Sequence, residues 1–146
     1  MVATVDRVDL KIKTAVGALA GTDGFAYFGL CGREFRISST DDDFEAGSDR
    51  IYTYGAGANV EFSNFNDPRS PFAIRTEDVS IFPAYVRFVP SARGEILGLG
   101  DTWEIESIRL TLNPGSEEIV LTALGGSNRI LLGHVGGLIC YLRVGT

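Results

Sequence analysis

The stretch WEIESIRLTL, residues 103–112, is the most regular element of the sequence and decides the fold class. Its apolar side chains fall into two groups of opposite phase, Trp103 and Ile105 in the first, and Ile108, Leu110 and Leu112 in the second. A two-residue alternation is typical of a strand that buries one face against a core. Since a β-bulge inserts one extra residue into a strand, we predict a bulge near Ser107.

Similar strand signals flank this stretch on both sides. Residues 8–14 alternate apolar with polar or charged side chains without a break. The other candidates are short apolar runs bounded by turn residues: 25–31, 34–38, 51–54, 59–62, 78–90, 119–124, 129–132 and 138–144. Many short strands with no helical period predict an all-β antiparallel sandwich. We therefore expect one domain over residues 1–146 with about eight strands, and any helix to be a short turn near residues 91–93.

The composition agrees with a compact β domain and limits the partners. The 146 residues include 18 glycines, which suits a chain with many turns. The formal net charge of −6 argues against nucleic acid, and it disfavours anionic membranes unless a bound divalent cation inverts the local charge. No run of 18 apolar residues predicts a transmembrane segment, no signal peptide is visible, and the sequence assigns no compartment.

Few side chains in the sequence suggest catalysis. Cys31 and Cys140 each lie in an apolar run, so we expect two buried free thiols in preference to a disulfide. His134 is the single histidine, and without a matched nucleophile motif it supports neither a zinc site nor nucleophilic catalysis. Glu104 and Glu106 share one strand face, which we expect to be solvated.

Three blocks of the chain carry a family resemblance. The first contains Thr14-Ala15, Gly21-Thr22-Asp23, Ala26-Tyr27 and Leu30-Cys31-Gly32. The second is residues 44–51, in which Phe, Gly and Asp precede an apolar run, and the third is residues 103–108, in which Trp precedes alternating apolar residues. In this order the blocks resemble the PLAT/LH2 domain family. Two regions depart from the family pattern: residues 63–77 are longer and more polar, and residues 113–146 lack an aromatic ending.

The resemblance implies an eight-stranded antiparallel sandwich that docks onto a lipid surface or a protein partner. It also implies that calcium is sometimes held in the loops at one end of the sandwich. A chain of this kind would be a targeting or adaptor module, and we expect a non-catalytic binding function in place of an enzyme. This functional step depends on the resemblance, because a fold alone does not fix function.

Calcium prefers six to eight oxygen ligands, and two loops of the sequence are rich in them. The candidate ligands are Gly21, Thr22, Asp23, Asp43, Glu45, Asp49 and Asp101. If the loops of Asp23 and Asp49 meet at one rim, crowded carboxylates would repel one another until a cation neutralised them. The alternative is a solvated acidic loop in which Asp23 closes a turn.

Phe62, Phe65 and Phe72 flank a polar loop where burial is not obvious. An exposed apolar tip of this kind can insert into a lipid interface or into a partner's pocket. Alternatively, the three phenylalanines fold back and cap the core.

Two other functions remain open at this stage. A carbohydrate-binding sandwich would use Tyr52, Tyr54 or Trp103 as a stacking surface, although half-buried tyrosines and a core tryptophan need no such purpose. A structural subunit would form a homo-oligomer through the apolar C-terminal strands, whose edges could pair with another copy.

Overall fold

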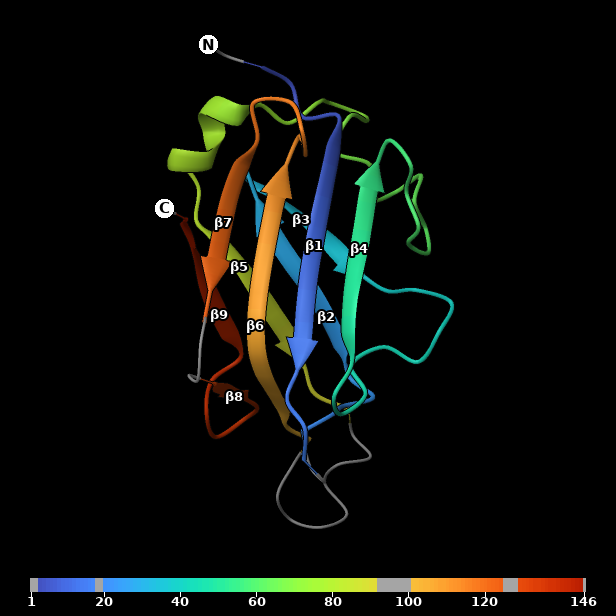
Figure 1. The fold of residues 1–146 in the computed structure, drawn as a ribbon, viewed down its shortest axis with the longest axis vertical. Helices are drawn as coiled ribbons and strands as arrows, with labels where there is room; N and C mark the ends of the chain where they lie inside the picture. Colours follow the sequence, from blue (N-terminus) through green and yellow to red (C-terminus); the bar gives the residue numbers. More distant parts are fainter. Residues whose placement is uncertain (1–2, 18–19, 92–100, 125–128, 146) are drawn as a thin grey trace.

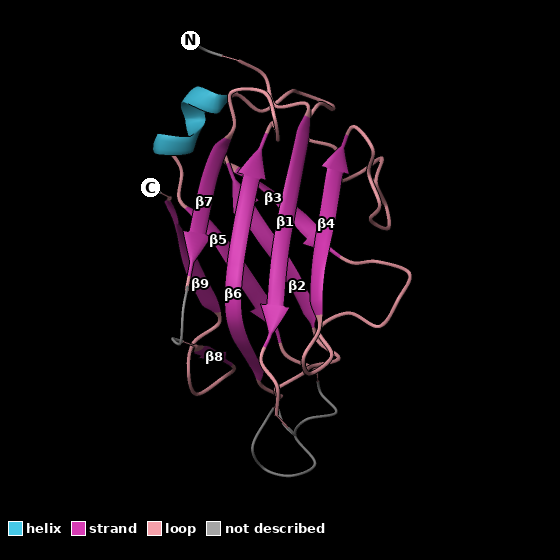
Figure 2. Ribbon diagram, viewed as in Figure 1, coloured by secondary structure: helices cyan, strands magenta, loops and turns pink. Residues whose placement is uncertain are grey.

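The computed structural model describes residues 3–17, 20–91, 101–124 and 129–145. Over these ranges the chain consists of strands joined by loops, with one short 3₁₀ helix, η1 (Figure 2). The elements are β1 (Arg7–Thr14), β2 (Phe25–Leu30), β3 (Arg33–Ile37), β4 (Asp49–Gly55), η1 (Thr76–Ser80), β5 (Ala84–Val89), β6 (Trp103–Leu112), β7 (Ile119–Ala123), β8 (Ile130–Leu132) and β9 (Ile139–Val144). In the described part of the chain no helix has the length and hydropathy needed to cross a membrane.

The strands form two facing layers that are joined along one side. In hydrogen-bonded order the path is β3-β2-β5-β9-β7-β6-β1-β4, and β8 pairs with β6 off this path. Figure 1 shows β7, β6, β1 and β4 in front, with β3, β2 and β5 behind them and β9 beside β7. All these pairings are antiparallel, so the predicted all-β sandwich is confirmed.

Strand β6 contains the predicted bulge. Lys13 of β1 lies opposite Ser107, whereas Thr14 lies opposite Ile105, so Glu106 is the extra residue. Both apolar groups of residues 103–112 therefore face the core despite their opposite phases.

Aromatic rings fill the space between the layers. The ring centroid of Phe28 lies 5.0 Å from that of Phe35 and 4.8 Å from that of Tyr54. The ring of Trp103 lies 4.6 Å from that of Phe44, which belongs to the loop before β4. Offset and edge-on ring pairs add to the stabilisation from buried area, so Phe44 anchors the acidic loop to the core.

Strands β3 and β4 are the two ends of the path, and the connection between β4 and β5 covers both edges. At β4, Asn59 donates from Nδ2 to the carbonyl of Ile51 (2.9 Å) and accepts at Oδ1 from the backbone N–H of Thr53 (2.8 Å). At β3, Oδ1 of Asn66 accepts from the backbone N–H of Arg36 (2.8 Å). Uncovered edges invite pairing with other chains, and these two asparagines occupy the groups that would pair.

One predicted strand segment is wrong, and a second is right only in its latter part. Residues 59–62 form turns, because the Asn59 side chain takes the bonds that a neighbouring strand would make to β4. Residues 78–82 belong to η1 and the turn after it, and β5 begins at Ala84, directly after Pro83. Proline cannot donate to a strand ladder, which explains this boundary. The helical turn predicted near residues 91–93 falls largely outside the described residues.

The expectation for the cysteines is confirmed, since Cys31 and Cys140 are both free and buried. Burial raises the pKa of both thiols, that of Cys31 to about 11 with a further contribution from the charge of Asp78. The neutral thiol is not the nucleophilic form, so neither side chain is activated for chemistry.

Candidate functional site

The loops that follow β1 and precede β4 come together at one end of the sandwich. The backbone N–H of Thr14 donates to the carbonyl of Ser48 (2.8 Å), and that of Gly47 donates to the carbonyl of Ala15 (3.0 Å). The backbone N–H of Thr22 donates to the carbonyl of Phe44 (3.1 Å). The turns that carry Asp23 and Asp49 therefore share a rim, as the calcium hypothesis requires.

A cavity of about 200 Å³ lies where these loops meet. We call it the acidic cavity; its carboxylate-bearing residues are Asp23, Asp41, Asp42, Asp43 and Glu45. Gly21 allows the close approach, because a Cβ there would come within 2.8 Å of the carbonyl oxygen of Phe44. Of the candidate ligands predicted from the sequence, Asp23, Asp43 and Glu45 line this cavity.

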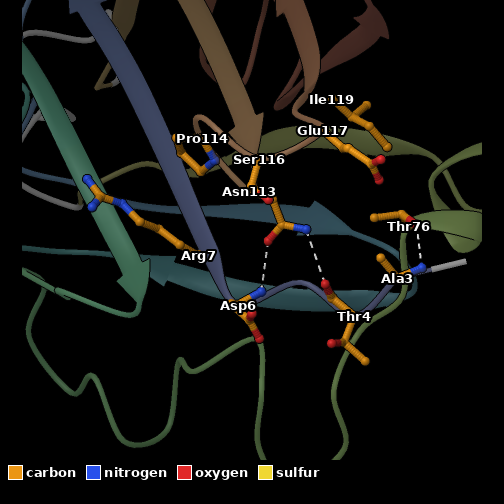
Figure 3. A pocket seen from close by; sticks show the side chains of 10 residues that line it. All are labelled: Ala3, Thr4, Asp6, Arg7, Thr76, Asn113, Pro114, Ser116, Glu117 and Ile119. Atoms are coloured by element: carbon orange, nitrogen blue, oxygen red, sulfur yellow. Dashed lines mark hydrogen bonds between the residues drawn. The ribbon is translucent and has the colours of Figure 1, made fainter.

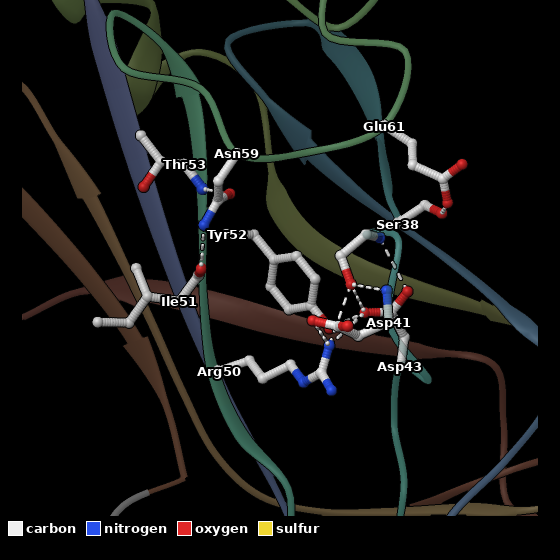
Figure 4. A network of polar contacts seen from close by, with 10 residues as sticks. Ser38, Asp41, Asp43, Arg50, Ile51, Tyr52, Thr53, Asn59 and Glu61 are labelled. Carbon is white, nitrogen blue, oxygen red and sulfur yellow. Dashed lines mark hydrogen bonds and ion pairs between the residues drawn. The ribbon is translucent and has the colours of Figure 1, made fainter.

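Asp43 is the centre of a polar network that fixes the acidic loop (Figure 4). Its Oδ1 accepts from the hydroxyls of Ser39 and Tyr52, each at 2.7 Å, and its Oδ2 accepts from the backbone N–H of Ser39 (2.8 Å). Nη1 of Arg50 lies 3.6 Å from Oδ1 of Asp43 and 3.5 Å from Oδ2 of Asp41. Burial, and then the hydrogen bond to Asp43, raise the pKa of Tyr52 far above its ordinary value.

Asp49 and Asp101 lie apart from the acidic cavity. Asp49 faces Lys11, with 3.9 Å between its Oδ1 and the lysine Nζ. Oδ2 of Asp101 accepts from the hydroxyl of Thr22 and from the backbone N–H of Ser91, both at 2.6 Å. Asp101 therefore ties the loop after β5 to the Gly21-Thr22-Asp23 turn, a structural role that spacing in the sequence did not reveal.

The carboxylates as arranged do not form a calcium cage. Over the described ranges, no three acidic, histidine or cysteine side chains stand close enough together to hold one metal ion. Asp43 already accepts three hydrogen bonds, which a cation would have to displace. Calcium binding at Gly21, Thr22, Asp23, Asp43, Glu45, Asp49 and Asp101 stays a prediction.

The three phenylalanines of the β4–β5 connection point away from the core. Phe62 is 52% exposed, Phe65 84% and Phe72 83%. The alternative in which they cap the core is therefore wrong. We call these three residues the phenylalanine surface.

The backbone that carries the phenylalanine surface is anchored at several points. Nη1 of Arg33 donates to the carbonyls of Asp67 (3.0 Å) and Phe72 (3.4 Å). Nδ2 of Asn66 donates to the carbonyl of Phe62 (3.0 Å), and the guanidinium carbon of Arg36 lies 5.3 Å from the Phe62 ring centroid. Sequence reasoning missed these anchors, because a buried asparagine in a polar run carries no sequence signal.

The residues proposed for sugar stacking are buried. Tyr52 is 2% exposed, and Tyr54 and Trp103 are inaccessible. A carbohydrate platform built on these three side chains is therefore wrong. Glu104 lies 3.5 Å from Arg129, and Glu106 lies 3.7 Å from Lys13, as expected for a solvated strand face. The single histidine, His134, is exposed in a turn.

Another hollow, of about 570 Å³, lies beside the start of β1 (Figure 3). Asn113 organises it, because its Oδ1 accepts from the backbone N–H of Asp6 (2.9 Å) and its Nδ2 donates to the carbonyl of Thr4 (3.1 Å). These bonds hold the N-terminal segment against the β6–β7 turn.

No family model matches the sequence, and no curated protein matches it. Solved structures share its fold. The alpha toxin from Clostridium absonum aligns with 96% of this chain at a TM-score of 0.61 and 17% identity, and the alpha-toxin of Clostridium perfringens aligns with 96% at 0.58 and 20%. A lipoxygenase in complex with arachidonate aligns with 95% at 0.53 and 13%. This chain spans 32%, 31% and 16% of those chains, respectively.

Proposed function

We propose that this chain, whose sandwich has the PLAT/LH2 fold of the alpha-toxins and lipoxygenase it resembles, is a non-catalytic module that docks onto a lipid surface. The neighbouring chains are three to six times longer than the shared fold, so their activities are not transferred here. What supports docking is the family resemblance together with one feature of this chain's own surface. The absence of a nucleophile motif in the sequence supports the non-catalytic part of the proposal.

The observation that carries the proposal is the exposure of Phe62, Phe65 and Phe72 on an anchored backbone. Fully burying a phenylalanine side chain gains roughly 1.5–3 kcal/mol, so two rings inserted into an interface gain roughly 3–6 kcal/mol. Because the backbone is already ordered by the Arg33 and Asn66 bonds, little conformational entropy opposes insertion.

The charge of the chain selects the kind of surface. A net charge of −6 is repelled by an anionic leaflet, so we propose a zwitterionic or neutral lipid surface. The competing occupant is an apolar pocket on a protein partner, and binding to lipid vesicles without protein separates the two.

We propose that the acidic cavity also binds a calcium ion. Five carboxylate-bearing residues and one cation, Arg36, line a space of about 200 Å³, and a divalent cation would offset the remaining negative charge. Docking through the phenylalanine surface does not require this ion.

The test is co-sedimentation with phosphatidylcholine vesicles. We expect the wild-type chain to pellet with the vesicles and the double variant Phe65→Ser/Phe72→Ser to stay in the supernatant. Ile51→Ser is the matched control. The Ile51 side chain is 53% exposed and apolar, but it lies on the outer face of β4 and not in the phenylalanine surface. Equal sedimentation of the double variant and the wild type would remove the phenylalanine surface from the proposal, and no sedimentation of the wild type would remove lipid docking.

A further inference from the structure

A groove opens where the two layers of the sandwich are joined. β7 and β9 pair at only two positions, Leu121 with Val144 and Thr122 with Arg143. Beyond Thr122 the described residues of these strands form no further pair, and residues of β1, β6, β7, β8 and β9 line a groove of about 1020 Å³. Phe62, Phe65 and Phe72 are not among the residues that line this groove, and in Figure 1 β7 and β9 lie on the side of the sandwich away from β4.

The groove combines an apolar floor with cations and lacks acidic lining residues among those described. Ile130, Ile139 and Val144 contribute to the floor, and the side chains of Ile139 and Val144 are exposed. The charged lining residues are Lys11, Arg109 and Arg143. In a chain of net charge −6, a surface with three cations and no carboxylate is a local reversal of sign.

The three cations lie in one cross-strand row. Lys11 of β1 is opposite Arg109 of β6, Arg109 is opposite Thr122 of β7, and Thr122 is opposite Arg143 of β9. Like charges directly opposite each other destabilise a sheet.

No described side chain neutralises all three positive charges of this row. Lys11 has one distant partner, Asp49 at 3.9 Å, and neither Arg109 nor Arg143 forms an ion pair with any described residue. The arrangement is therefore unfavourable in the free chain and would become favourable around a bound anion.

We propose that the groove binds a long-chain fatty acid, with its carboxylate at the Lys11–Arg109–Arg143 row and its hydrocarbon chain along the apolar floor. Arginine presents a planar pair of donors that matches a carboxylate, which explains two arginines at the head-group position. The groove volume is just above the usual range for small-molecule sites, about 300–1,000 Å³, so the groove has room for a long hydrocarbon chain. This site goes beyond surface docking, because it takes a single dissolved molecule and not a membrane.

The test is calorimetric titration with oleate below its aggregation threshold, with oleyl alcohol as a ligand of the same chain and a neutral head. We expect saturable binding of oleate and much weaker binding of oleyl alcohol. Arg109→Glu and Arg143→Glu should each weaken oleate binding about tenfold or more, since hydrogen bonds to charged groups are the strong ones. Arg75→Glu, an exposed arginine beside η1, is the matched control and should bind as wild type.

The two arginines are exposed, so their variants should fold, and circular dichroism checks this. Unchanged oleate affinity in both folded variants would overturn the proposal, as would equal affinity for oleyl alcohol or no saturable binding by the wild type. The site is separable from membrane docking: Phe65→Ser/Phe72→Ser should keep oleate binding, and Arg109→Glu should keep vesicle sedimentation.

Discussion

The indole Nε1 of Trp103 donates a 3.0 Å hydrogen bond to Oγ1 of Thr14, and both side chains are fully buried. The bond links the end of β1 to the start of β6, next to the bulge at Glu106. A buried donor that loses its acceptor is left with an uncompensated desolvation penalty.

Replacing Thr14 with valine keeps the shape of the side chain and removes this acceptor. We expect Thr14→Val to lower the free energy of unfolding by about 1–3 kcal/mol, measured by urea denaturation. Thr111→Val, on the outer face of β6, is the matched control and should change stability by about 0.5 kcal/mol or less. Equal stability of the two variants would show that the indole finds another partner.

Sequence analysis located β6 most completely, because this strand has one buried face and one exposed face. In β6 the alternation and its phase slip located both the strand and the bulge, because burial there depends on side-chain direction alone. The pattern failed at residues 59–62, where side-chain amides and not apolar faces decide the structure. Asn59 and Asn66 act through hydrogen bonds to strands that are adjacent in space, and a sequence does not show which edge an amide reaches.

The candidate site was predictable in composition and not in geometry. The resemblance to Gly-Thr-Asp blocks placed the turns of Asp23 and Asp49 at a common rim, which the backbone bonds between the loops support. It did not show that Asp43 would be enclosed by Ser39 and Tyr52 or that Asp101 would bond Thr22. The cation row of the groove was also hidden, because Lys11, Arg109 and Arg143 meet only through strand register.

Tyr52 makes the stability of the fold sensitive to alkaline pH. Its raised pKa keeps the phenol protonated in the folded chain, whereas in the unfolded chain it ionises near its ordinary value of 10.0. Above pH 10 the folded state therefore holds more protons than the unfolded state, and the free energy of unfolding falls as pH rises.

Tyr52→Phe should make this fall shallower and should lower stability at pH 7 by about 1 kcal/mol, because the bond to Asp43 is lost. The decline should not vanish, since burial also raises the pKa of Tyr54. Urea denaturation between pH 7 and 11 measures both effects, with Tyr141→Phe on the exposed face of β9 as the control. An unchanged slope in Tyr52→Phe would contradict the assignment.

Gly29 of β2 lies directly beneath the ring of Tyr85 on the neighbouring strand, and a Cβ at this position would overlap the ring. Moving the ring would break the 2.7 Å bond from the Tyr85 hydroxyl to Glu34. We expect Gly29→Ala to lower the free energy of unfolding by about 1–3 kcal/mol.

A double-mutant cycle with Tyr85→Ala isolates this clash. Gly29→Ala should be nearly neutral when the ring is absent, and thermal denaturation of the four chains gives the coupling. Equal destabilisation in both backgrounds would place the cause in the backbone and not in the ring.

We predict that the acidic cavity binds calcium and that calcium therefore raises the free energy of unfolding. Weak calcium sites in proteins have Kd values of about 10⁻⁴–10⁻³ M. With a Kd of about 1 mM, 10 mM calcium adds about 1.4 kcal/mol to the free energy of unfolding through ligand binding to the native state. Differential scanning calorimetry should show this as a higher Tm.

The acidic residues that are exposed and lie around the cavity provide the matched variants. Asp42→Asn/Glu45→Gln should abolish the calcium-dependent rise while leaving the Asp43 network and the calcium-free Tm in place. Asp6→Asn, remote from the cavity, should keep the rise. Magnesium, which demands a smaller and more regular octahedral site, should have less effect than calcium in the wild type. A Tm that calcium leaves unchanged would remove the ion from the proposed function, and the phenylalanine surface would then act without it.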